Sequence, residues 1–147
     1  MRLFTRTITI AKPCEAVFDF FVDFRQAPRW RQSVKTMEAV TPGPVRAGTI
    51  IRTTWDLAGD DYTLDLEVAA CERPSLWRHQ VDEHDFYTTV EYRFEPYPAG
   101  TRVTMQCDVR PTALYGWLSV PILFLSRGKM YQEQLPQLKQ ALETWRT

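Results

Sequence analysis

The chain has 147 residues, which suits one domain over residues 1–147 with enough length to bury a core. Its 18 Lys and Arg residues balance its 18 Asp and Glu residues, so the formal net charge is zero. This balance, with no basic cluster to neutralise phosphates, argues against a nucleic-acid binder, and we expect no nucleic-acid partner.

The cysteines and the apolar segments indicate the compartment. Cys14, Cys71 and Cys107 are odd in number and far apart, without the spacing of a zinc site, so we expect small core residues in a reducing compartment, no metal and no cofactor. The first ten residues lack the apolar run of a signal peptide. The longest apolar stretch, Ala113–Leu125, is shorter than the about 20 residues that span a bilayer. We therefore predict a cytoplasmic protein without stable membrane insertion.

The chain begins with a strand and a short helical region. Leu3–Ile10 is rich in Thr and Ile, as strands are. Pro13 suits the first turn of a helix, and the apolar stripe that follows predicts a helix from Pro13 to about Phe24. Ala27-Pro28 interrupts the pattern, and Arg29–Ser33 is expected to form a second short helical turn that carries Trp30.

A period of two then dominates the pattern from Val34 to Val109, with short turns between the segments. Successive strands joined by short turns pair antiparallel, and alternating apolar and polar residues indicate a sheet covered on one face only. Including the first, we predict seven strands: Leu3–Ile10, Val34–Val40, Gly48–Leu57, Tyr62–Cys71, Leu76–Asp82, Phe86–Glu95 and Thr101–Arg110.

The cover must come from helices, and the C-terminal part supplies one. From Thr112 to Trp145 apolar residues recur at helical spacing. Pro121 and Pro136 each remove an amide hydrogen bond, so we expect one bent helix or two consecutive helices. The later apolar positions are Leu135, Leu138, Leu142 and Trp145.

Several short motifs, in this order, resemble one known superfamily. Ile8–Trp30 resembles the opening of the polyketide cyclase/dehydrase branch of the START-like, or Bet v 1-like (SRPBCC), superfamily, with Asp23 and Trp30 at the ends of an Asp-x-x-x-x-x-x-Trp stretch. The later motifs that resemble the branch are Arg46–Thr49, Glu72–Trp77, Tyr92–Glu95 and Gly100–Thr104. The resemblance implies an α+β helix-grip fold: a curved antiparallel sheet of about six or seven strands around a long C-terminal helix, with two short helices after the first strand.

The resemblance also implies a cavity between the concave face of the sheet and the long helix. Such sites are mostly apolar with a few polar anchors, but the same residues would also form a filled core. The expected lining residues are Trp55, Leu64, Leu66, His79, Phe86, Thr88, Tyr92, Phe94, Met105, Leu118, Ile122 and Leu125.

His79 is the polar candidate of most interest. If Trp77 and Val81 point inward, so does His79, because strand side chains alternate. An inward imidazole could bind a ligand carbonyl or act as a general base near neutral pH, although an internally satisfied histidine fits the same pattern, and the opposite strand phase would point it outward. Arg6 and Arg52 could anchor an acidic ligand if their strand phases point inward.

Three functions remain open. The first is binding or carriage of a small hydrophobic molecule, lipid or aromatic and polyketide-like. The second is a polyketide cyclase or dehydratase in the same cavity, with His79 as its candidate catalytic residue. The third is a protein–protein adaptor, or homodimer contact, that uses the apolar 113–125 segment.

Overall fold

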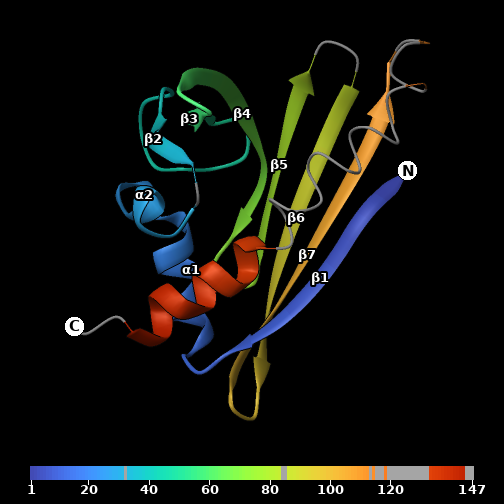
Figure 1. Cartoon of the computed structure of the whole chain (residues 1–147). Helices are drawn as coiled ribbons and strands as arrows, with labels where there is room; N and C mark the ends of the chain where they lie inside the picture. Colours follow the sequence, from blue (N-terminus) through green and yellow to red (C-terminus); the bar gives the residue numbers. More distant parts are fainter. Residues whose placement is uncertain (32, 84–85, 113, 115–117, 119–132, 145–147) are drawn as a thin grey trace.

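A computed structural model of the chain (Figure 1) describes residues 1–31, 33–83, 86–112, 114, 118 and 133–144. The elements in chain order are β1 (Arg2–Ile10), α1 (Cys14–Val22), the 3₁₀ helix η1 (Phe24–Gln26), α2 (Ala27–Trp30), β2 (Val34–Ala39), β3 (Ile50–Leu57), β4 (Asp60–Glu72), β5 (Leu76–Glu83), β6 (Phe86–Tyr97) and β7 (Gly100–Pro111). Residues 133–144 form a helix, called here the C-terminal helix.

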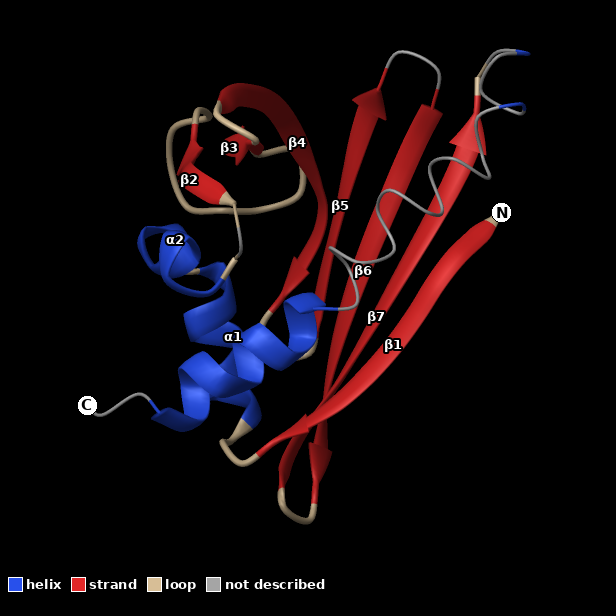
Figure 2. Cartoon of the chain, in the orientation of Figure 1, coloured by secondary structure: helices blue, strands red, loops and turns tan. Residues whose placement is uncertain are grey.

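The seven strands form one antiparallel sheet in the order β1-β7-β6-β5-β4-β3-β2. From β2 to β7 each strand pairs with the next along the chain, and β1 closes the order by pairing with β7. Figure 2 shows α1, α2 and the C-terminal helix on one side of the curved sheet. We call the side of the sheet that faces these helices the inner face. The architecture is the predicted α+β helix-grip fold, with two short α-helices after the first strand.

The helical region after β1 is divided into three short helices, α1, η1 and α2. The prediction of one helix from Pro13 to about Phe24 is too long, because α1 ends at Val22. The Asp23 side chain accepts a hydrogen bond from the backbone N–H of Arg25 and so starts η1. The second turn begins earlier than Arg29, at Ala27, with Pro28 in its first turn.

Alternation along the strands places one apolar row after another on the inner face. On β7 the buried residues are Thr101, Val103, Met105, Cys107 and Val109. The ring of Phe21, from α1, packs on this face 4.6 Å from the Tyr92 ring, 5.4 Å from Phe94 and 6.0 Å from Trp77, measured between centroids. The core therefore lies between α1 and the middle strands.

The C-terminal helix is attached to the same face. Lys139 donates from Nζ to the backbone oxygen of Thr9 at 2.8 Å, and the Ala11 backbone N–H donates to Oε1 of Glu143 at 3.2 Å. The helix continues on both sides of Pro136, so it does not restart there. Pro121 and Trp145 lie outside the described residues. The predicted apolar stripe is confirmed where it is described, by the buried side chains of Leu135, Leu138 and Leu142.

Gly100, at the start of β7, has no room for a side chain. It has a φ of +141°, and an added Cβ would lie 2.1 Å from the carbonyl oxygen of Ile10 and 2.8 Å from the nitrogen of Lys12. Neither is the end of a flexible side chain, so relief requires a shift of the β1–α1 connection.

We predict that Gly100→Ala lowers the free energy of unfolding more than Gly59→Ala does. Gly59 also has a positive φ, +92°, but nothing lies within 4 Å of its added Cβ. Gly59→Ala should thus be destabilised only by backbone strain, which costs roughly 1–2 kcal/mol. Gly100→Ala should be destabilised by this strain and also by the clash. Urea unfolding of both variants measures the difference, and equal losses would contradict the close approach.

Candidate functional site

His79 lies on the inner face, as the first of the two strand phases predicts. Trp77, His79 and Val81 are buried on β5, whereas Arg78 and Gln80 between them are only partly buried. Trp77 donates from Nε1 to Nδ1 of His79 at 2.9 Å. A nitrogen that accepts a hydrogen bond carries no proton, so the neutral ring holds its proton on Nε2. His79 therefore presents an N–H donor with its other nitrogen.

The surroundings keep this ring neutral. Burial and, after it, the positive charge of Arg31 lower the pKa of His79 from 6.5 to about 3. An efficient general base has a pKa near the working pH. This argues against the expectation that His79 acts as a base near neutral pH, and favours hydrogen bonding as its role.

Tyr92, on β6, connects the inner face to the C-terminal helix. Its side chain is buried, and its hydroxyl donates a hydrogen bond to Oε1 of Gln134. Burial raises the pKa of Tyr92 to about 12, although the charge of Arg31 and a hydrogen bond from it act in the opposite direction. The Tyr92 and His79 rings lie 6.5 Å apart between centroids, so the two polar side chains are neighbours.

Arg31 completes this group, and the sequence reasoning missed it. It follows α2 and is only 8% exposed. Its guanidinium carbon lies 4.4 Å from the centroid of the Trp30 ring and 4.9 Å from that of Phe21. Because this charge shifts the pKa of both His79 and Tyr92, the three side chains form one electrostatic unit, called here the Arg31–His79–Tyr92 cluster.

Arg6 and Arg52, the two arginines that the sequence proposed as anchors, lie on opposite faces. Arg6 pairs with buried Met105 on β7, so it belongs to an inner-face row near the β1 edge. Arg52 is on the outer face and forms a bidentate ion pair with Asp65, with N···O distances of 3.0 and 3.2 Å. Arg52 is therefore not an anchor for an internal ligand.

The expected lining residues divide by their burial. Trp55, Leu64 and Phe86 are partly buried. Thr88 is buried and donates to Oε2 of Glu83 at 3.3 Å. The other fully buried members of the expected lining are Leu66, His79, Tyr92, Phe94 and Met105.

The helix positions of the expected lining fit less well. Leu118 was expected to face the strands, but it is 67% exposed. Leu114 is also exposed. Ile122 and Leu125 lie outside the described residues.

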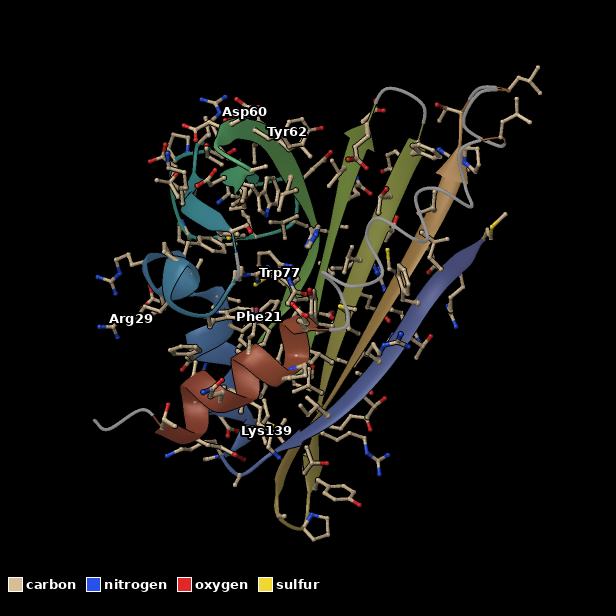
Figure 3. The ribbon with its side chains drawn as sticks, viewed as in Figure 1. Phe21, Arg29, Asp60, Tyr62, Trp77 and Lys139 are labelled. Carbon is tan, nitrogen blue, oxygen red and sulfur yellow. The ribbon has the colours of Figure 1, made fainter. Side chains whose placement is uncertain are left out.

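A groove of about 570 Å³ lies between α2 and the C-terminal helix. Figure 3 shows Arg29 of α2 extending away from Phe21 and Trp77, which lie on the inner side. Arg31 belongs to both regions, because it lines the groove and also acts on His79. The lining residues are Pro28, Arg29, Trp30, Arg31, Ser33, Val34, Gln137, Gln140, Ala141 and Thr144.

The described part of the chain lacks two features. No group of three or more His, Cys, Asp or Glu side chains there is arranged to hold a metal ion. No described helix is both long enough and apolar enough to cross a membrane.

Comparison with known proteins identifies the family. The model of the family described as "Polyketide cyclase / dehydrase and lipid transport" matches residues 1–143. The chain belongs to this family. Its members, within the SRPBCC or START-like superfamily, typically bind hydrophobic ligands. No curated protein matches the sequence.

Solved structures show the same fold at low sequence identity. A START superfamily protein from Mycobacterium smegmatis is 14% identical, with a TM-score of 0.76 over 95% of this chain and 96% of that chain. Ara h 8.0201 is 13% identical, with a TM-score of 0.71 over 97% of both chains. The di-domain ARO/CYC BexL from the BE-7585A biosynthetic pathway is 16% identical, with a TM-score of 0.76 over 97% of this chain and 50% of that chain. At these identities the likeness concerns the fold alone.

We predict that the His79 ring does not titrate between pH 5 and 8. The reason is its pKa of about 3, caused first by burial and then by Arg31. Ring ¹⁵N chemical shifts followed by NMR should keep the neutral pattern, with the proton on Nε2, across this range. A midpoint near 6.5 would show that the ring is solvated and that the Trp77 hydrogen bond is not maintained.

The same shift predicts how stability depends on pH. As the pH falls below about 6.5 the unfolded chain protonates this ring, whereas the folded protein does not until about pH 3. The unfolded state then binds more protons, so the free energy of unfolding falls, by up to about 1.4 kcal/mol per pH unit. Urea unfolding between about pH 6 and pH 5 should show a steeper loss in the native protein than in His79→Asn. Equal slopes would contradict the burial of a neutral ring.

Proposed function

We propose that the protein binds a small hydrophobic molecule, a lipid or an aromatic polyketide-like compound, between the inner face of the sheet and the C-terminal helix. The observation that carries the proposal is a largely apolar inner face with a few oriented polar side chains. Trp77 orients His79, and Gln134 of the C-terminal helix binds Tyr92. Ligand sites usually combine an apolar lining with a small number of polar groups of this kind.

The family supports the same proposal, because its typical property is the binding of hydrophobic ligands. The expected contact residues are those that the sequence proposed on the strands, from Trp55 to Met105, together with Ile122 and Leu125 of the C-terminal segment. Leu118 is left out because its side chain is exposed.

The alternative of a cyclase or dehydratase receives less support from the site. The resemblance to BexL concerns the fold, and general acid–base catalysis needs a group that exchanges protons near the working pH. Among the described residues of the cluster, His79 titrates far below neutrality, at about 3, and Tyr92 far above it, at about 12. The cluster is therefore better suited to hold a ligand than to move protons.

The adaptor alternative depends on the apolar 113–125 segment. Leu114 and Leu118 are exposed there. The rest of the segment lies outside the described residues. We rank a binding role first because the family typically binds hydrophobic ligands.

Native mass spectrometry of the protein purified from its own cells tests the proposal directly. We expect a bound lipid or aromatic compound, or uptake of fluorescent lipids and flavonoids by the empty protein. An empty protein that takes up neither class would contradict the proposed function.

A pair of neighbouring substitutions tests the position of the ligand. We predict that His79→Ala weakens binding of the compound found at least about tenfold, because a buried polar anchor is lost. Gln80→Ala, one residue along β5, should leave the affinity unchanged, because Gln80 binds Glu67 on the outer face. Isothermal titration calorimetry on folded variants measures both. Equal effects of the two substitutions would place the ligand elsewhere.

A further inference from the structure

The sheet has a long outer edge along β1. In the described part of the chain β1 pairs with β7 alone, and Figure 1 shows it as the outermost strand on that side of the sheet. It is nine residues long, against six for β2 at the opposite edge. Thr5 and Thr7 are exposed there. The backbone groups of an edge strand are a template for pairing with another strand, so proteins protect long edges.

The register of β1 on β7 shows which backbone groups face this edge. Met1 exchanges both of its backbone hydrogen bonds with Val109. A bulge before Phe4 then shifts the pattern by one residue, so from Phe4 onward the even-numbered residues bond to β7. The backbone N–H and C=O groups that point to the outer edge are therefore those of Thr5, Thr7 and Thr9.

Two basic side chains bind carbonyl oxygens on this edge. Lys139, from the C-terminal helix, donates from Nζ to the backbone oxygen of Thr9 at 2.8 Å. Arg6 donates from Nη1 to the backbone oxygen of Thr5 at 3.2 Å. Charged side chains, Lys above all, are a common means of keeping an edge strand from pairing with another chain.

The two bound oxygens lie symmetrically about Thr7, and this spacing indicates which strand would fit the edge. If two copies of β1 pair antiparallel with Thr7 opposite Thr7, Thr5 of each copy faces Thr9 of the other. The two oxygens that Arg6 and Lys139 bind are then acceptors in the ladder between the copies. The formal net charge of zero also means that two copies approach without net repulsion.

We infer that Arg6 and Lys139 hold the β1 edge closed against a second copy of this chain, whose own β1 is the strand that the edge fits. Without these two side chains, two copies pair antiparallel about Thr7 and the sheet continues from one copy into the other. The inference does not depend on the proposed ligand, because it concerns the outer edge of the sheet alone.

The oligomeric state, measured by sedimentation equilibrium, tests the inference. The probe is the double variant Arg6→Thr, Lys139→Met, in which both oxygens lose their side-chain donors. We expect it to dimerise at least about tenfold more tightly than the native chain, because pairing then breaks no hydrogen bond to a side chain. Equal dimerisation constants would overturn the inference.

Two controls separate pairing of the edge from loosening of the C-terminal helix. Lys139→Arg keeps a cationic donor for Thr9 and should dimerise no more tightly than the native chain. Glu143→Ala removes the bond from the Ala11 backbone and the ion pair with Lys139, but it leaves Lys139 on Thr9. It should also behave as the native chain does. A Glu143→Ala dimer as tight as that of the double variant would assign dimerisation to the helix and overturn the inference.

Cysteine crosslinking in the double variant tests the register of the pairing. Thr7→Cys places two cysteines opposite each other, with Cα atoms about 5.5 Å apart, which is within the range for a disulfide. Thr5→Cys is the matched control, because Thr5 faces Thr9, so its two introduced cysteines are roughly 14 Å apart. With oxidised glutathione as the oxidant, Thr7→Cys should form the intermolecular disulfide at least about tenfold faster. Equal rates would show that the copies do not pair about Thr7.

Arg6→Thr alone covers the case in which the double variant does not fold. The bond from Arg6 is local to β1, so its loss leaves the attachment of the C-terminal helix intact. In this background Thr7→Cys should still crosslink faster than Thr5→Cys, since one oxygen in each copy is released. The absence of any difference between the two would overturn the inference.

Discussion

The alternation of side chains along the strands is the constraint on which the rest of this structure depends. It gives the antiparallel sheet one apolar face, and this face must be covered because buried apolar area is the main source of stability. Two separate parts of the chain supply the cover. Phe21 brings α1 against the rings of Trp77 and Phe94, and Leu138 is among the residues that bring the C-terminal helix to the same side.

The polar side chains of the inner face follow from the same constraint. The phase of β5 that buries Trp77 and Val81 also buries His79, and β6 places Tyr92 beside it. A buried polar group is costly unless it is hydrogen-bonded. Trp77 satisfies one nitrogen of His79, and Gln134 satisfies the Tyr92 hydroxyl. These partners also set the direction in which the remaining donors point, so stability and ligand recognition use the same contacts.

The parts of this architecture that repeat along the chain were predictable from the sequence. The alternation of apolar and polar residues defines the strands, and the predicted strand ends agree with the observed ends to within about two residues. The helical period of Leu135, Leu138 and Leu142 likewise predicts the face by which the C-terminal helix packs. The inward orientation of His79 followed once Trp77 and Val81 were assigned to the core.

The missed features depend on contacts between distant segments. Arg31 lies in an irregular connection with no periodicity, and its burial results from the approach of α2 to the sheet, so no local pattern indicates it. The low pKa of His79 needs both burial and the charge of Arg31, which is 48 positions earlier in the chain. Leu118 fits an inward stripe by spacing alone, and its exposure shows that spacing identifies a helix face without saying what covers it.

The central claim is that a hydrophobic guest binds between the inner face and the C-terminal helix. Intermolecular nuclear Overhauser effects between a bound ligand and the labelled protein test it most directly, because they report which side chains lie within a few ångströms of the guest. The account predicts contacts from ligand protons to the methyl group of Met105 and the rings of Phe94 and Tyr92, all on the inner face. Contacts confined to outer-face residues such as Arg52 and Asp65 would contradict it.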